Sequence, residues 1–231
     1  MLFDIGIITM DKNSSIFKRC FSSIVDRTDK NVPYQIFVQE GKEREAINFN
    51  ELVKMFENRF VVYLNDDVEI IDENWLSYLY SICRLPKIAL VGCSEIFTDL
   101  DRIMYLQNKQ IFNSVNIQKS LLTEPGWIAS YCWMWDRLKT DIKFDESIPT
   151  SELCGKGMTD VDACIAVKEA GFGIMKDYRF RIYHEHKGET EEQLKARLEL
   201  YPIQLQYMKE KWGEEKFNSY YIHGTQFMDQ F

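Results

Sequence analysis

The N-terminal part of the chain alternates between short apolar runs and longer stretches whose apolar residues recur at helical spacing. The apolar runs predict buried strands at Phe3–Thr9, Gln35–Val38, Phe60–Leu64 and Ile88–Val91. The stretches between them predict helices over Ser14–Val25, Ala46–Phe56 and about Glu73–Cys83. Repeated strand-helix units favour an α/β fold, in which a mainly parallel sheet has helices on both faces.

The pattern changes after Ser94. Residues 94–119 are irregular and polar with one strand-like run at Ile111–Ile117, and the following segments predict a strand at Trp127–Trp135, a loop at Asp145–Met158, a helix at Asp160–Ala170 and a strand at Gly173–Tyr183. Gly171 is a candidate for the residue just past the end of that helix. Glu189–Lys211 predicts a charged helix interrupted near Pro202. We therefore expect one domain over residues 1–188 and a C-terminal helical extension over 189–231 that packs on it.

Composition narrows the class of protein. The 231 residues are 45% hydrophobic, which suits one globular core, and the formal charge of −8 argues against a nucleic-acid partner. The six cysteines form no CxxC pair, and we expect a reduced, cytoplasmic compartment. The first residues do not resemble a signal peptide, and no apolar run approaches the ~18 residues of a membrane span.

Polar residues follow three of the predicted parallel strands. Thr9 ends the first, Gln39 follows the second, and Asn65-Asp66-Asp67 follows the third. Because ligands of such sheets gather at the carboxyl ends of strands, these residues should line one edge together. The adjacent carboxylates of Asp66 and Asp67 repel each other, and a divalent cation would relieve that repulsion. A solvated turn before a helix capped by Asp72 is the alternative without a ligand.

The wider segment Phe60–Ile70, followed by Asn74-Trp75-Leu76 and by Pro86–Gly92, resembles the central segment of family 2 glycosyltransferases with the GT-A fold. The resemblance implies a nucleotide-diphospho-sugar transferase fold with a Rossmann-like mixed, mainly parallel sheet flanked by helices. It also implies that Asp67 is a metal ligand and that Asp66 helps to bind the nucleotide sugar, with Asn65 in a slot that the family often fills with Asp.

A second segment, Gly157–Val167, looks like the helix start that carries the catalytic base of that family, and Asp160 matches the base. Thr159 stands where the family has Glu. Such a carboxylate can take the proton of an acceptor hydroxyl in one inverting displacement. A retaining mechanism is the alternative, and the stereochemistry of the product would distinguish the two. The alternative to a catalytic role is an acidic variant of a capping box, formed by Thr159 and Asp162.

Other residues follow from the same resemblance. Tyr183-His184 resembles the strand-terminal Tyr-His of the family, which makes His184 a candidate second metal ligand. Thr9 is the candidate contact of the opening strand to the nucleotide base, and Gln39 stands near the family's base-binding Asp. Of four aromatic residues between the two acidic segments, we expect about two in the core and the others free to stack on sugar rings: Trp127, Tyr131, Trp133 and Trp135.

The resemblance implies a glycosyltransferase that moves a sugar from a nucleotide-diphosphate sugar to a hydroxyl of a glycan or glycoconjugate, with Mn²⁺ or Mg²⁺. UDP is the commonest donor nucleotide of the family. A nucleotidyltransferase would carry a glycine-rich loop after the first strand, and Thr9–Asn13 has no glycine. No P-loop motif occurs. A non-catalytic sugar- or nucleotide-binding protein with a decayed site remains the alternative from another class.

Overall fold

The computed structural model describes residues 1–41, 44–96, 122–151, 153, 157–185 and 190–225. Its centre is an eight-stranded sheet with the order β2-β1-β3-β7-β5-β8-β4, and β6 pairs with β8. The strands are β1 (Phe3–Thr9), β2 (Tyr34–Glu40), β3 (Phe60–Asn65), β4 (Val68–Ile70), β5 (Ile88–Ile96), β6 (Leu122–Thr123), β7 (Cys132–Asp136) and β8 (Gly173–His184). β1, β2, β3, β5 and β8 run in one direction, and β4, β6 and β7 run in the other. The sheet is therefore mixed and mainly parallel.

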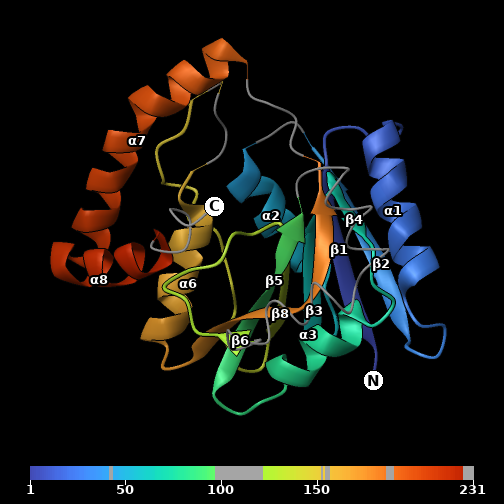
Figure 1. The fold of residues 1–231 in the computed structure, drawn as a ribbon. Helices are drawn as coiled ribbons and strands as arrows, with labels where there is room; N and C mark the ends of the chain where they lie inside the picture. The colour runs from blue at the N-terminus through green and yellow to red at the C-terminus, as the bar shows by residue number, and fades with distance from the viewer. Residues whose placement is uncertain (42–43, 97–121, 152, 154–156, 186–189, 226–231) are drawn as a thin grey trace.

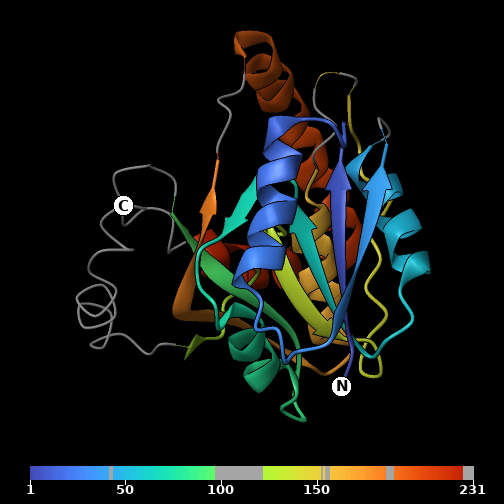
Figure 2. The same cartoon turned by 90° about the vertical axis from the view of Figure 1, so that its right-hand side faces the viewer.

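Helices cover both faces of this sheet (Figures 1 and 2). They are α1 (Ser15–Arg27), α2 (Glu45–Met55), α3 (Trp75–Cys83), α6 (Thr159–Glu169), α7 (Glu191–Trp212) and α8 (Glu214–Thr225). α1 and α3 pack on one face, whereas α2 and α6 pack on the other. α7 and α8 lie outside α6, and an apolar cluster joins the three helices. None of the helices within the described ranges has the length and apolar character that a bilayer crossing requires.

The alternation within β3 shows why this strand is central. Val62 and Leu64 point into the core beneath α1 and α3, and Val61 and Tyr63 point into the core beneath α2 and α6. All four side chains are buried, so the strand is apolar on both faces, as expected of a strand covered by helices on each side.

Most predicted elements form where the pattern placed them. The strands and helices of the first 91 residues are present with shifts of a few residues at their ends. Ser14 caps α1 by accepting a hydrogen bond from the Phe17 N–H (3.1 Å). Gly171 has a φ of +86°, the left-handed conformation expected past the end of α6. The prediction for Ile111–Ile117 lies outside the described residues.

Two predictions need correction, and one alternative is not borne out. The strand expected from Trp127 begins only at Cys132, which pairs with Leu64 near the end of β3. Helix α7 continues through Pro202, where the chain is exposed and water can replace the lost backbone hydrogen bond. Thr159 is not a helix cap, since α6 has Met158 as its N-cap residue with no side-chain hydrogen bond.

Candidate active site

The carboxyl ends of β1, β2 and β3 meet at one edge of the sheet. Ile8 of β1 pairs with Asn65 of β3 on one side and with Gln39 of β2 on the other. The buried Thr9 hydroxyl donates a hydrogen bond to Asp66 Oδ2 at 2.6 Å. The parallel register therefore brings Thr9 and Asp66 into contact, although 57 positions separate them. Gln39 lies on the outer strand, half-buried at the same edge.

Tyr63 lies at the centre of the acidic residues. Its side chain is buried, and its hydroxyl donates to Asn65 Oδ1 at 2.8 Å. Burial raises the pKa of Tyr63 well above its usual range, and four surrounding carboxylates add to the effect: Glu45, Asp67, Asp66 and Asp160. One phenol thus senses carboxylates from α2, the turn after β3 and α6, so the two acidic segments of the sequence converge in space.

His184 lies between two carboxylates. The short strand β4 pairs with the end of β8, with Val68 opposite His184. The imidazole Nε2 is 3.3 Å from Asp67 Oδ1, and Nδ1 is 2.7 Å from Glu95 Oε2. Burial of the ring lowers its pKa, but the bonds to Asp67 and Glu95 outweigh it and raise the pKa of His184 to about 9. Without a ligand, the ring is therefore a cation held between Asp67 and Glu95.

Asp160 is the second residue of α6. Its Oδ1 accepts a hydrogen bond from the Val161 N–H at 2.8 Å. Loss of hydration, and then the nearby Glu45 carboxylate, raise the pKa of Asp160 to about 7, although the backbone N–H groups of Val161 and Ser130 favour the ionised form. A carboxylate with a pKa near neutrality is suited to accept a proton in catalysis. The preceding Thr159 hydroxyl donates to Glu45 Oε2 at 3.4 Å, which links α6 to α2.

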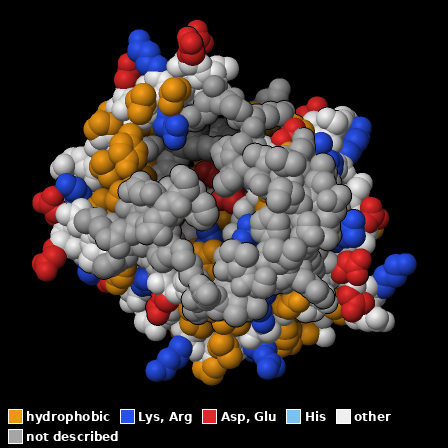
Figure 3. Space-filling model, in the orientation of Figure 1, with side chains coloured by type: hydrophobic (Ala, Val, Ile, Leu, Met, Phe, Trp, Pro, Cys, Tyr) orange, Lys and Arg blue, Asp and Glu red, His pale blue; other side chains and the backbone are white. Residues whose placement is uncertain are grey.

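Figure 3 shows acidic side chains at the bottom of a hollow on one face of the molecule. The turn alternative for Asn65-Asp66-Asp67 does not describe this environment well, since all three residues are partly buried. Asp72 does accept a hydrogen bond from the Asn74 N–H (2.9 Å), but α3 starts only at Trp75.

No family model matches this chain. An uncharacterized protein, y4gI of Sinorhizobium fredii (strain NBRC 101917 / NGR234), is 27% identical over 188 residues, which are 74% of this chain and 20% of that protein. The O-antigen biosynthesis protein RfbC of Myxococcus xanthus is 35% identical over 54 residues, which are 23% of this chain and 4% of that protein. The chain thus matches only a fifth or less of the length of these relatives.

Solved structures give broader matches. GalNAc-T7, solved with UDP, GalNAc and Mn²⁺, matches with a TM-score of 0.60 over 95% of this chain and 50% of that chain, at 11% identity. The mannosyltransferase PcManGT of Pyrobaculum calidifontis, in complex with GDP-Man and Mn²⁺, matches with a TM-score of 0.53 over 81% and 58%, at 10% identity. TarS residues 1–349 of S. aureus match with 0.52 over 90% and 66%, at 11% identity.

The chain has the GT-A fold. The fold expected from the resemblance is confirmed, and the low identities carry the comparison no further than the fold. The GT-A fold also explains the order of the sheet, in which β7 runs antiparallel between β3 and β5 and brings Trp133 and Trp135 into the core. Tyr131 is buried as well, so three of the four aromatic residues are core rather than two, and Trp127 is half-buried.

The residues beside His184 fit a divalent cation in this GT-A fold. Asp67 offers a carboxylate oxygen and His184 an imidazole nitrogen, both common metal ligands, and Glu95 holds the other ring nitrogen. A carboxylate that orients a ligating histidine in this way is a regular feature of metal sites. Within the ranges that the structure covers, no three His, Cys, Asp or Glu side chains gather as a ready cation site. A cation here would need further ligands from a bound diphosphate or from water.

Sequence reasoning did not find Glu95, Glu45 or Tyr63. The predicted strand ended at Val91, whereas β5 continues to Ile96 and carries Glu95 to the edge of the site. Glu45 reads in the sequence as an ordinary acidic first residue of a helix. Tyr63 reads as one more apolar residue of a buried strand, and only its hydroxyl contact with Asn65 shows its place at the site.

Proposed function

We propose that this protein is a glycosyltransferase that moves a sugar from a nucleotide-diphosphate sugar to a hydroxyl group of a carbohydrate or glycoconjugate, with inversion. The observation that carries the proposal is the convergence of the turn after β3 and the start of α6 around Tyr63. This convergence supports the assignment of two groups to one site: Asp160, whose pKa is raised to about 7, and the Asp67–His184 pair, which suits a cation. The proteins solved with GDP-Man or with UDP and Mn²⁺ support the same class of donor.

The donor would bind at the edge formed by β1, β2 and β3. Thr9, Gln39, Asn65 and Asp66 lie there and would contact its nucleoside and sugar. Asp67 and His184 would hold Mn²⁺ or Mg²⁺, which stabilises the negative charge of the departing diphosphate when it is bound. Glu95 would keep the His184 Nε2 directed towards Asp67.

Asp160 would act on the acceptor. Its carboxylate takes the proton of the acceptor hydroxyl while the hydroxyl oxygen forms a bond to the anomeric carbon of the sugar. The bond from that carbon to the phosphate oxygen breaks, and its electron pair leaves with the nucleoside diphosphate. Attack and departure on opposite sides of the carbon give one inverting step. The pKa of about 7 leaves a large fraction of Asp160 ionised at neutral pH.

A thermal-shift screen tests the donor class. The purified chain is heated with UDP, GDP, CMP or dTDP, each with and without manganese. A ligand that binds only the folded state stabilises it by about 2.7 kcal/mol at a hundredfold excess over its dissociation constant. We expect a shift that needs both a nucleotide and manganese, with UDP as the first choice. No shift with any pair would favour the non-catalytic binding protein.

Two substitutions separate the roles of the acidic groups. Asp67→Ala should remove the manganese-dependent part of the nucleotide shift. Asp160→Asn should retain that shift but lose sugar transfer, because the amide keeps the shape of the side chain without its basicity. Full transfer by either purified variant would refute the role given to that residue. The division at residues 188 and 189 and the cytoplasmic location remain predictions from the sequence.

A further inference from the structure

Three partly exposed aromatic side chains from distant parts of the chain meet beside α6. They are Trp127 before β7, Tyr201 of α7 and Tyr221 of α8. The rings of Trp127 and Tyr221 are nearly parallel, with an interplanar angle of 8° and centroids 6.5 Å apart. The hydroxyl oxygens of Tyr201 and Tyr221 are 2.5 Å apart. We call Trp127, Tyr201 and Tyr221 the aromatic cluster.

The aromatic cluster is anchored next to the start of α6. Trp127 and Tyr221 pack against an apolar group that includes Met158, just before α6, and Val161 and Ile165 of α6. The chain just after Trp127 also contacts this helix, since the Ile128 N–H donates to Cys164 Sγ at 3.5 Å.

The cluster is also close to the Asp160 carboxylate. Ser130, three residues after Trp127, directs its backbone N–H towards that carboxylate. Burial and Tyr201 raise the pKa of Tyr221, and the Asp160 carboxylate adds to the rise. The aromatic cluster therefore borders the group to which we assign the acceptor proton.

The exposure of the cluster distinguishes it from the core. Trp133 and Trp135 are fully buried, whereas Tyr201 is 38% exposed and Trp127 and Tyr221 are half-buried. Side chains that serve only to fill the core are shielded from water, and these are not. Aromatic faces combined with hydroxyl groups suit a ligand that has both apolar C–H faces and hydroxyls, as a pyranose ring does.

We propose that Trp127, Tyr201 and Tyr221 bind the acceptor, a carbohydrate whose pyranose ring stacks on the aromatic cluster while one of its hydroxyls faces Asp160. The proposal rests on the proposed function and adds the surface that would bind the acceptor and the pyranose ring that this surface would recognise. It also gives α7 and α8 a direct role in substrate binding. The paired phenols of Tyr201 and Tyr221 supply hydrogen-bonding groups at the outer edge of this surface.

Saturation-transfer NMR on the full chain tests this proposal. The probes are the methyl glycosides of glucose, galactose, mannose and N-acetylglucosamine, each added with the nucleotide that gives a thermal shift and with magnesium, which is diamagnetic and leaves the glycoside signals sharp. We expect at least one glycoside to receive saturation at its ring C–H protons. Tyr221→Leu should weaken its binding about tenfold, because the leucine keeps the apolar contact with Phe217 but removes the aromatic face.

Tyr220→Leu is the matched control, because Tyr220 is the adjacent tyrosine of α8 but contacts Glu169 and Lys168 instead. It should bind the glycoside as the unmodified chain does. Tyr201→Leu, at the most exposed position of the cluster, is the second variant if Tyr221→Leu does not fold.

The proposal is overturned if no glycoside binds the unmodified chain, or if the folded cluster variants bind as well as the Tyr220→Leu control. The nucleotide-and-manganese shift, measured on the same protein preparations, shows separately whether the proposed function fails.

Discussion

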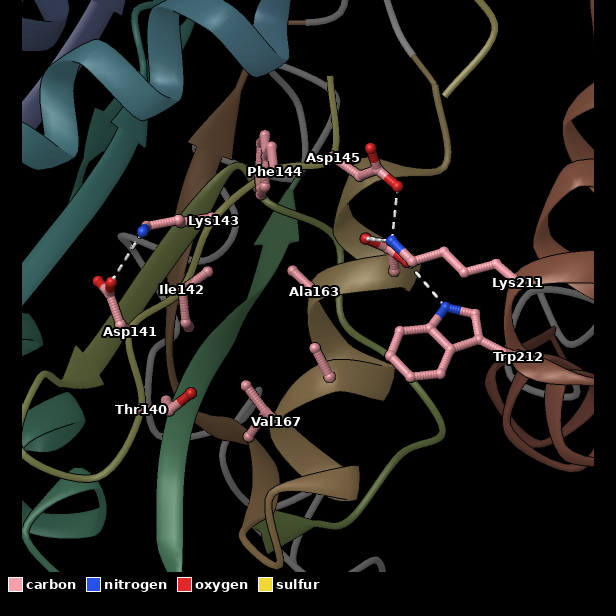
Figure 4. Close-up of a pocket in the computed structure, with 12 residues that line it drawn as sticks. Thr140, Asp141, Ile142, Lys143, Phe144, Asp145, Ala163, Val167, Lys211 and Trp212 are labelled. Carbon is pink, nitrogen blue, oxygen red and sulfur yellow. Dashed lines mark hydrogen bonds and ion pairs between the residues drawn. The ribbon is translucent and has the colours of Figure 1, made fainter. Parts of the chain in front are cut away.

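Lys211 lies near the end of α7 and connects the C-terminal extension to α6 and to the loop after Phe144. Replacing Lys211 tests how strongly this contact holds the extension to the domain. The Lys211 ammonium lies 2.6 Å from Asp145 Oδ2 and 2.8 Å from Asp162 Oδ1. These side chains border a cavity of about 270 Å³ between the segment 140–145, α6 and the end of α7 (Figure 4). Lys211→Met keeps most of the aliphatic side chain and removes the charge together with the ammonium hydrogen bonds to Asp145 and Asp162.

The expected loss of stability follows from the groups that remain around the carboxylates of Asp145 and Asp162. The Asp162 side chain is 5% exposed, so the loss of its cation leaves a buried charge. Breaking a buried ion pair costs about 3–5 kcal/mol. Lys211 itself is 31% exposed, and Asp162 keeps the Trp212 indole N–H at 2.7 Å. We therefore expect Lys211→Met to lower the free energy of unfolding by about 2–3 kcal/mol, between the buried and exposed limits.

Urea unfolding followed by tryptophan fluorescence measures this loss. Lys216→Met is the matched control, because Lys216 also joins the extension to α6, through Glu169, but both side chains are exposed. It should cost only about 0–1 kcal/mol. The deficit of Lys211→Met should also shrink as the pH falls, because burial raises the pKa of Asp162 and protonation of this carboxylate removes the uncompensated charge. Equal losses in the two variants, or a deficit independent of pH, would refute the reasoning.

Three further predictions concern Asp160 and the core. Because the pKa of Asp160 is raised to about 7, kcat/KM of the transfer reaction should fall about tenfold per pH unit below that value, and a pH profile flat down to about pH 5 would contradict its role. The folded chain holds the proton of the Asp160 carboxyl group more tightly than the unfolded chain does, so the free energy of unfolding falls as the pH rises from about 4 to about 7. In unfolding measurements at about pH 8, Asp160→Asn should therefore be more stable than the unmodified chain by up to about 4 kcal/mol. Gly6→Ala should cost about 1–3 kcal/mol in urea unfolding, because the added Cβ would lie 2.5 Å from Phe56 Cζ in the core, and an unchanged midpoint would disprove that constraint.

The local pattern of apolar residues was enough to predict the central strands of the sheet and the helices that cover them. The apolar runs at Phe3–Thr9 and Phe60–Leu64 lead to β1 and β3, because a run that is apolar on both faces is stable only when helices cover both. The parallel arrangement then follows from the alternation of strands and helices. It places Thr9 and Asp66 at one edge of the sheet, and the structure brings them into contact.

The tertiary structure decided which residues complete the candidate site. His184 and Glu95 are 89 positions apart, and they meet only because β5 and β8 run side by side. β4 was not predicted, since three residues carry too little periodicity, yet its pairing with β8 brings Asp67 to His184. The aromatic cluster likewise needs α7 and α8 to fold back over α6. Sequence patterns report which face of an element is buried, whereas the partners across that face depend on long-range packing.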